Sequence, residues 1–365
     1  MDAGTWPAIW LRDNCPCPDC RVPGSGQKLF QITDLPEDLV VTAVEQDPTT
    51  VTVTFGPDGH RSVFGRDWLA AAGRADFRTE DGKRLWSGPG APVPTGDWER
   101  YRADPGHRAE MLDAVLTGGF ALLRGVPVQA GTVAMVAGTF GHVRETNYGR
   151  VFDVRVESTP ANLASTGLAL SPHTDNPYRD PVPTVQLLHC HLSAADGGDT
   201  LLVDGFAAAA QLRAEDPDSF AVLTRTPVPF GYRDRGTDLR ASQPLIELSA
   251  DGRIRGIRFN NRSLQALRRP PGEVAAFYAA YRRWARRLAR PEQARTLRLT
   301  PGDCLIFDNT RVLHGRTGFT STGDRLLQGC YADLDGLAST LRMLNAQKEM
   351  DKEEVSAGAP GGRDR

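Results

Sequence analysis

Short strand-like runs outnumber helical stretches along this chain. Residues 40–46 (VVTAVEQ) and 50–55 (TVTVTF) are rich in β-branched residues, and a GPDG turn follows the second run. The apolar runs at 120–127, 184–204, 301–307 and 311–316 also predict strands, and the first three contain glycine or proline turns. Helical spacing is clearest at 105–117 and in the stretch 273–293, where the helix is expected to end near Pro291. The pattern predicts a mainly β fold with helices, built as a sheet sandwich or barrel rather than from alternating βαβ units.

A segment rich in proline and glycine separates two parts of the chain. Ser87–Gly96 (SGPGAPVPTG) contains three residues of each kind, a composition typical of loops. We therefore predict a small β-rich domain at 1–86, a linker at 87–97 and a larger domain at 98–346. The polar segment 347–365 ends in SAGAPGGRDR and predicts a disordered tail.

Composition narrows the functional classes. The 365 residues carry 43 Lys and Arg against 45 Asp and Glu, which argues against binding nucleic acid or membranes through bulk charge. No apolar run approaches the ~18 residues of a membrane span, and the start lacks a signal-peptide pattern. We therefore expect a cytoplasmic protein with reduced thiols. Five arginines at helical spacing between 282 and 290 favour a solvated helix face over a nucleic-acid contact.

Three cysteines cluster near the N-terminus. Cys15, Cys17 and Cys20 form a C-x-C-x2-C run, and thiolates on so tight a loop converge on one point, as a tetrahedral zinc site requires. We nominate His60 as the fourth ligand, because it is the only histidine in the N-terminal domain. A closed Cys3His site would be structural and would stabilise a domain with a small core. Unliganded reduced cysteines are the alternative.

A second candidate metal site combines an H-x-D pair with a distant histidine. His173 and Asp175 stand two residues apart, and His314 follows in DNTRVLHGR. Two histidines and one carboxylate form the facial triad that suits Fe(II) and leaves positions open for a 2-oxoacid and dioxygen. Arg325, eleven residues after His314, is placed to bind the distal carboxylate of 2-oxoglutarate, and the Thr200 hydroxyl is a further donor to it.

With these motifs in hand, the chain resembles the γ-butyrobetaine hydroxylases, which belong with the trimethyllysine hydroxylases to the taurine-dioxygenase-like superfamily. The segments that carry the resemblance are WLRDNCPCPDC, HTDNPYRDP, VQLLHC, GGDTLLVDGF, RFNNRS, FDNTRVLHGR and LQGCYADLDG. The resemblance spans roughly residues 6 to 345. It implies a double-stranded β-helix (jelly-roll) oxygenase core behind a zinc domain, with Fe(II) at the triad, 2-oxoglutarate at Arg325 and ascorbate as reductant. It also implies a homodimer, and an N-terminal domain whose first strand is shortened.

The same resemblance implies an aromatic cage for a quaternary ammonium group, which donates no hydrogen bonds and is held by cation–π attraction. Four aromatic residues are candidates for the cage: Tyr148, Phe152, Tyr178 and Tyr331. Phe152 stands where a tryptophan is often found in the family, and Ser165 replaces a tyrosine, so we expect a thinner cage. Plain core packing is the alternative for any one of these rings.

The anionic end of the substrate is expected at Asn162 and at one of Asn260 or Asn261, which resemble polar substrate contacts of the family. The leading hypothesis is therefore hydroxylation of γ-butyrobetaine to carnitine, with trimethyllysine less favoured. Arg179 and Arg262 are extra cations that would suit a phosphonate, so 2-(trimethylammonio)ethylphosphonate is the first alternative. For either arginine a surface salt bridge is the competing interpretation. A binding protein on a degenerate oxygenase fold is the alternative from a different class.

Overall fold

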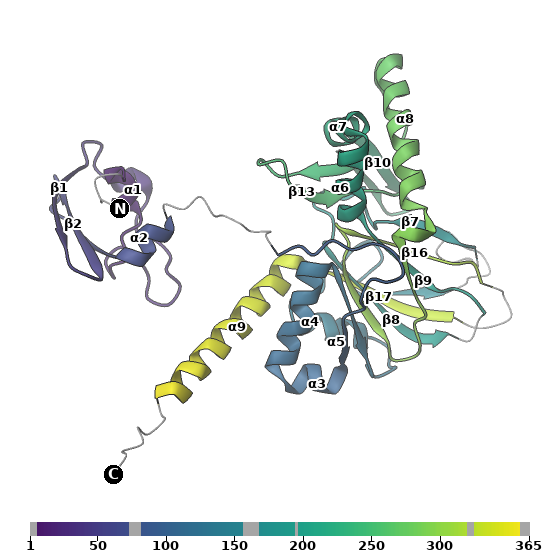
Figure 1. Cartoon of the computed structure of the whole chain (residues 1–365), viewed down its shortest axis with the longest axis horizontal. Helices are drawn as coiled ribbons and strands as arrows, with labels where there is room; N and C mark the ends of the chain where they lie inside the picture. Colours follow the sequence, from purple (N-terminus) through teal and green to yellow (C-terminus); the bar gives the residue numbers. More distant parts are fainter. Residues whose placement is uncertain (1–5, 73–81, 156–167, 194–195, 320–324, 358–365) are drawn as a thin grey trace, which may run out of the picture. The chain divides into compact units, whose positions relative to one another are not determined.

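Two units make up the chain in this computed structural model, Met1–Asp81 and Gly82–Arg365 (Figure 1). The structure describes residues 6–72, 82–155, 168–193, 196–319 and 325–357. The segment 87–97, predicted as a linker, instead belongs to the second unit. Its last residues form strand β4 (Thr95–Asp97), which pairs in parallel with β5 (Phe120–Arg124), and Val93 packs against a buried cluster. Proline and glycine are compatible with the edge of a sheet, which explains the difference.

The N-terminal unit is built around an antiparallel sheet of three strands in the order β1-β2-β3. The alternation in the sequence places Val51, Val53 and Phe55 of β2 on one buried face, where they pack with Leu11 and Leu69 of the two helices. The elements of this unit are α1 (Ala8–Asp13), the 3-10 helix η2 (Ile32–Asp34), β1 (Val40–Gln46), β2 (Thr50–Gly56), β3 (Arg61–Gly65) and α2 (Arg66–Ala72).

Two sheets form the centre of the second unit, one with six strands in the order β4-β5-β15-β8-β17-β6 and one with four in the order β14-β9-β16-β7. Strands of both sheets line a single cavity, and together they make the double-stranded β-helix that the sequence predicted. The remaining strands of these sheets are β6 (Phe152–Arg155), β7 (Leu170–His173), β8 (Val185–Ser193), β9 (Thr200–Asp204), β14 (Ala294–Leu297), β15 (Cys304–Asp308), β16 (Val312–Arg316) and β17 (Arg325–Ala332).

Helices cover the sheets in two groups, each with its own buried core. The first group packs residues such as Leu112 and Val136 against the six-stranded sheet and consists of α3 (Trp98–Ala103), α4 (Pro105–Gly118), α5 (Thr132–Gly138) and α9 (Leu334–Ala357). The second packs around Phe277 and Trp284 and consists of α6 (Gly205–Glu215), α7 (Pro217–Arg225) and α8 (Pro271–Leu288), followed by the 3-10 helix η4 (Pro291–Gln293). Two hairpins adjoin this second group: β10 (Val228–Arg233) with β11 (Asp238–Gln243), and β12 (Ile246–Leu248) with β13 (Ile254–Ile257).

Local sequence explains where helix α4 begins and ends. The Asp104 carboxylate accepts hydrogen bonds from the backbone amides of Gly106 and His107, and Pro105 occupies the first turn, where its missing N–H costs nothing. Gly119 ends the helix at φ 92°, and a Cβ there would lie 2.8 Å from the Val312 side chain. Only glycine fits that position without strain, so the chain turns directly into β5.

A buried ion pair fixes the turn between β15 and β16. Arg311 is fully buried and donates to both carboxylate oxygens of Asp204, at 3.1 and 2.9 Å. It also donates to the backbone carbonyls of Thr117 and Arg84, at 2.8 and 2.6 Å. A buried guanidinium is tolerated when its donors are satisfied in this way. The arrangement holds the strand that carries His314.

Two predicted boundaries differ from the structure. Helix α8 ends at Leu288, slightly before Pro291, near which the sequence predicted its end; proline disfavours helical conformation at the residue before it. Helix α9 continues to Ala357, into the segment 347–365 that was predicted to be disordered. Its sequence there, QKEMDKEE, is polar but consists largely of good helix formers, which extend the helix. No helix in the described ranges is both long and apolar enough to cross a membrane.

Candidate active site

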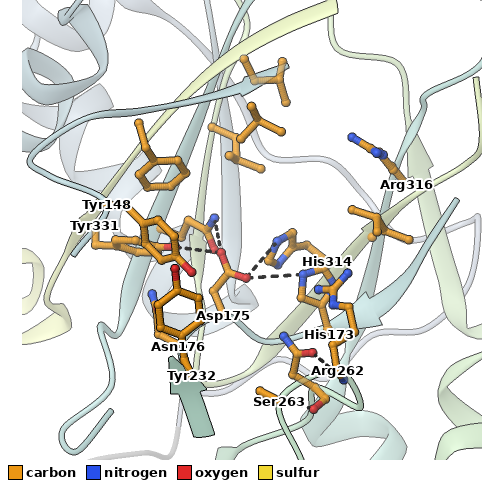
Figure 2. Close-up of a pocket in the computed structure, with 18 of the residues that line it drawn as sticks. Tyr148, His173, Asp175, Asn176, Tyr232, Arg262, Ser263, His314, Arg316 and Tyr331 are labelled. Carbon is orange, nitrogen blue, oxygen red and sulfur yellow. Dashed lines mark hydrogen bonds and ion pairs between the residues drawn. The ribbon is translucent and has the colours of Figure 1, made fainter. Parts of the chain in front are cut away.

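The three predicted ligands of the second metal site come together in the cavity of the oxygenase unit (Figure 2). His173 ends β7 and His314 lies on β16, and the register of these neighbouring strands pairs the two residues directly. Asp175 follows two residues after His173, with Oδ1 at 3.4 Å from Nε2 of His173 and 4.0 Å from Nε2 of His314. The donor atoms all lie within 4.8 Å of one another, as a mononuclear metal site requires.

The protonation states of this cluster suit a divalent cation. Burial, together with the neighbouring His173, lowers the pKa of His314 to about 3, so the imidazole is neutral at pH 7. Burial alone would raise the pKa of the Asp175 carboxyl, but His314, His173 and Tyr331 hold it below its usual range. Nδ1 of His173 donates to the Ser171 carbonyl at 2.9 Å, which leaves the Nε2 lone pair for a metal. The donor set therefore fits Fe(II).

Asp175 is held in place through both its backbone and its side chain. The Asn309 side chain accepts from the Asp175 amide at 2.8 Å and donates to the Asp175 carbonyl at 3.0 Å. The carboxylate oxygen Oδ2 accepts from Gln186 at 2.9 Å and from the Tyr331 hydroxyl at 2.8 Å. Figure 2 shows the carboxylate between the two histidines on one side and Tyr148, Tyr232 and Tyr331 on the other. The H-x-D motif did not reveal these supporting residues.

The residues predicted to bind 2-oxoglutarate begin two strands that line the same cavity. Thr200 starts β9 and Arg325 starts β17. Gly198 has a φ of 74° and lies against Arg325, so a Cβ added at Gly198 would be 3.3 Å from Nε of Arg325. The GGDT segment thus brings backbone close to the guanidinium. Arg325 lines the cavity, and among the described residues no acceptor takes a hydrogen bond from its guanidinium.

Arg316 is a lining residue that the sequence reasoning missed. It is 4% exposed, and its guanidinium donates to the Leu168 carbonyl at 3.3 and 3.2 Å. Phe319 lies between two cations, with its ring centre 5.0 Å from Arg316 and 5.7 Å from Arg325. Burial and the charge of Arg325 lower the pKa of Arg316 to about 10. Side chains two residues apart on a strand share a face, so the spacing of His314 and Arg316 could have indicated that Arg316 also faces the cavity.

Five aromatic rings form one wall of the cavity. The predicted residues Tyr148, Phe152, Tyr178 and Tyr331 are joined by Tyr232 of β10, which the sequence reasoning missed. Ring centres are 5.1 Å apart for Phe152 and Tyr331, 6.0 Å for Tyr148 and Phe152, 5.8 Å for Tyr148 and Tyr232, and 5.1 Å for Tyr178 and Tyr232. Hydroxyls of Tyr148 and Tyr178 lie 2.9 Å apart. Burial raises the pKa values of these tyrosines, so the rings stay neutral.

The polar candidates divide between inside and outside the cavity. Asn260 and Arg262 line it, whereas Asn261 is directed to α8, where its side chain accepts from the Tyr281 hydroxyl at 2.9 Å. Arg179 is also absent from the lining and donates to the Asn147 side chain at 2.5 Å. Asn162 and Ser165 lie outside the described residues. The cavity has a volume of about 560 Å³, within the usual range for a small-molecule site.

The N-terminal cluster also assembles as predicted. Nε2 of His60 lies 3.2, 3.8 and 3.6 Å from the sulfur atoms of Cys15, Cys17 and Cys20. His60 follows β2, so the sheet brings it to the cysteine loop that follows α1. Burial, together with Arg12, lowers the pKa of His60 and favours its neutral form. Three thiols and one imidazole in this geometry fit a structural zinc ion.

The jelly-roll core and the His-Asp-His cluster define an Fe(II)- and 2-oxoglutarate-dependent dioxygenase. The chain belongs to the taurine catabolism dioxygenase TauD, TfdA family, which matches residues 82–331. Residues 2–70 match the gamma-butyrobetaine hydroxylase-like N-terminal domain, so this chain combines the two domains in sequence.

Relatives match along most of their length. A gamma-butyrobetaine dioxygenase of Pseudomonas sp. (strain AK-1) is 37% identical over 92% of this chain and 89% of its own length. The human gamma-butyrobetaine dioxygenase is 33% identical over 94% of this chain and 92% of its own length. A trimethyllysine dioxygenase of Meyerozyma guilliermondii is 29% identical over 93% of this chain and 90% of its own length. The solved structure of an asparagine oxygenase has a TM-score of 0.53 at 21% identity, covering 65% of this chain and 82% of its own. That likeness concerns the fold.

Proposed function

We propose that this dioxygenase hydroxylates an unactivated C–H bond of a small quaternary-ammonium zwitterion, and that γ-butyrobetaine is its substrate. The observation that carries the proposal is the aromatic wall beside the His-Asp-His cluster, in one cavity of about 560 Å³. Neutral aromatic faces attract a trimethylammonium group, which neither donates nor accepts hydrogen bonds. The names of the relatives, gamma-butyrobetaine and trimethyllysine dioxygenases, support the same substrate class.

Each end of the cavity has a distinct role in this proposal. His173, Asp175 and His314 hold Fe(II), and Arg325 with Thr200 receives the distal carboxylate of 2-oxoglutarate. Once bound, the metal and the cosubstrate supply the oxidising chemistry. The protein binds the trimethylammonium group against Tyr148, Phe152, Tyr178, Tyr232 and Tyr331. Asn260 and Arg262, with Asn162, receive the anionic end, which fixes the carbon that faces the metal.

Arg262 supports a second candidate substrate. Its guanidinium lines the cavity, and the described residues offer it no hydrogen-bond acceptor. In Figure 2 it lies on the histidine side of Asp175, away from the labelled tyrosines. A guanidinium there binds a carboxylate, but a phosphonate with more charge and one more oxygen uses its donors more fully. The alternative is therefore 2-(trimethylammonio)ethylphosphonate. The expected homodimer and cytoplasmic location stay predictions.

The test is substrate-stimulated succinate formation from 2-oxoglutarate with Fe(II), ascorbate and oxygen. We expect γ-butyrobetaine to stimulate turnover and to yield a hydroxylated product, whereas the variant His173→Ala stays inactive. The phosphonate and trimethyllysine are assayed in parallel, and Arg262→Gln serves as the matched variant. Stimulation by the phosphonate alone, lost in Arg262→Gln, would replace the first substrate by the second. Uncoupled turnover with no stimulation by any quaternary-ammonium compound would refute the substrate class.

A further inference from the structure

We propose that Gln186 and Tyr331 are positioning residues for the metal, because they hold the distal oxygen of Asp175, and that Tyr331 thereby links the substrate cage to the metal centre. The positioning role requires the metal cluster alone. The link to substrate rests on the proposed function, because it needs a ligand in the aromatic cage.

The two oxygens of the Asp175 carboxylate have different surroundings. Oδ2 accepts two hydrogen bonds of ordinary length, at 2.9 Å from Gln186 and 2.8 Å from Tyr331. Oδ1 faces the histidine nitrogens, at 3.4 and 4.0 Å. An ionised carboxylate has about four lone-pair directions, and the two donors occupy those of Oδ2. Only Oδ1 of Asp175 is therefore free to bind the metal, which leaves coordination positions for 2-oxoglutarate and dioxygen.

The two donors are fixed by one feature of the fold. Gln186 on β8 and Tyr331 on β17 are directly paired across neighbouring antiparallel strands, and both are buried, at 1% and 3% exposure. With its amide nitrogen directed to Asp175, Gln186 leaves its own Oε1 buried and without a partner among the described residues. Because directly paired residues on neighbouring strands share one face of the sheet, the register of β8 and β17 places both donors at Asp175.

Tyr331 has a second role through its ring. The ring centre lies 5.1 Å from that of Phe152, in the wall proposed to receive the trimethylammonium group. One side chain therefore contacts the substrate with its face and the metal ligand with its hydroxyl. A ligand that shifts the ring changes the hydrogen bond to Oδ2, and so changes the environment of the metal. Tyr148 offers the comparison, because its hydroxyl pairs with Tyr178 and not with Asp175.

The positioning role is tested by Mn(II) binding to the full-length, zinc-loaded protein without substrate, followed by electron paramagnetic resonance. Tyr331→Phe and Tyr148→Phe both keep the ring and remove one cavity hydroxyl. We expect Tyr331→Phe to weaken Mn(II) binding roughly 10-fold or more, as loss of a partner of a metal ligand typically does, and Gln186→Leu to do the same. Tyr148→Phe is expected to keep the affinity of the unaltered protein. Equal Mn(II) affinity in the unaltered protein and all three variants would overturn the positioning role. A loss of Mn(II) affinity in Tyr148→Phe as large as that in Tyr331→Phe would overturn it as well.

The link to substrate is tested anaerobically on the visible absorption band of the Fe(II)–2-oxoglutarate complex. We expect γ-butyrobetaine or the phosphonate to shift this band in the unaltered protein and in Tyr148→Phe, but not in Tyr331→Phe at a saturating ligand concentration. A full shift in Tyr331→Phe would overturn the link. No shift in any protein would overturn the link and count against the proposed substrate class, whereas the Mn(II) measurement would still decide the positioning role.

Discussion

Replacing Tyr232 by leucine removes one face of the aromatic wall while keeping an apolar side chain on the β10–β11 hairpin. The ring is partly exposed, with its centre 5.1 Å from that of Tyr178 and 5.8 Å from that of Tyr148. Cation–π attraction is worth about 0.5–1 kcal/mol at exposed sites and about 2 when desolvated, so a half-buried face contributes about 1 kcal/mol. At about 1.4 kcal/mol per tenfold in affinity, we expect γ-butyrobetaine to bind about fivefold more weakly.

The assay compares γ-butyrobetaine with 5,5-dimethylhexanoate, its uncharged-end analogue, in which carbon replaces the ammonium nitrogen. Dissociation constants are measured for the anaerobic Fe(II)–2-oxoglutarate complex of the unaltered protein, Tyr232→Leu and Tyr232→Phe. Tyr232→Phe keeps the aromatic face and loses the hydroxyl, which donates to Asp234 at 2.9 Å, so its affinity is expected to change little. Tyr232→Leu is expected to lose affinity for the cation selectively. An equal loss for both compounds would refute the reasoning, because the ring would then act by packing rather than by its electrostatic face.

Three further predictions concern the other sites. Arg325→Gln is expected to raise the KM for 2-oxoglutarate about 10- to 100-fold, because a charge-assisted hydrogen bond contributes about 1.5–3 kcal/mol. The control is Arg298→Gln, which removes a cation hydrogen-bonded to Asp199. An equal rise in KM in both variants would contradict the role of Arg325 in binding 2-oxoglutarate. Cys17→Ser is expected to lower zinc content and Tm together, as a structural ligand must, and an unchanged Tm at full zinc loading would exclude that role. Burial and His191 lower the pKa of His189 to about 4 from 6.5, so the unfolded chain binds a proton first as pH falls. The free energy of unfolding is therefore expected to decrease from pH 6.5 towards 4 in denaturant titrations, and His189→Gln to reduce that slope; an identical slope in both proteins would contradict the shift.

Much of the chemistry was predictable from the sequence because it depends on residue type and short spacing. The short spacing of the C-x-C-x2-C run allows three sulfur atoms to meet near one point, and H-x-D places two ligands on one side of an extended segment. The alternation at 50–55 gave a strand with one buried face for the same local reason. Where local composition misled, as at 87–97 and at the start of 347–365, neighbouring structure or helix propensity decided the outcome.

Other features depend on which strands lie side by side, and composition does not encode that. Tyr232 reaches the cage from the β10–β11 hairpin, and Asn260 lines the cavity, whereas the side chain of Asn261 accepts a hydrogen bond from Tyr281 of α8. Tyr331 and Gln186 meet at Asp175 because β17 pairs with β8 in one register, and a shift of one residue would turn both side chains to the opposite face. The sequence by itself therefore determined which groups are available to bind iron, zinc and 2-oxoglutarate. Only the tertiary structure decided which distant side chains support them, because strand register sets contacts between residues far apart in the chain.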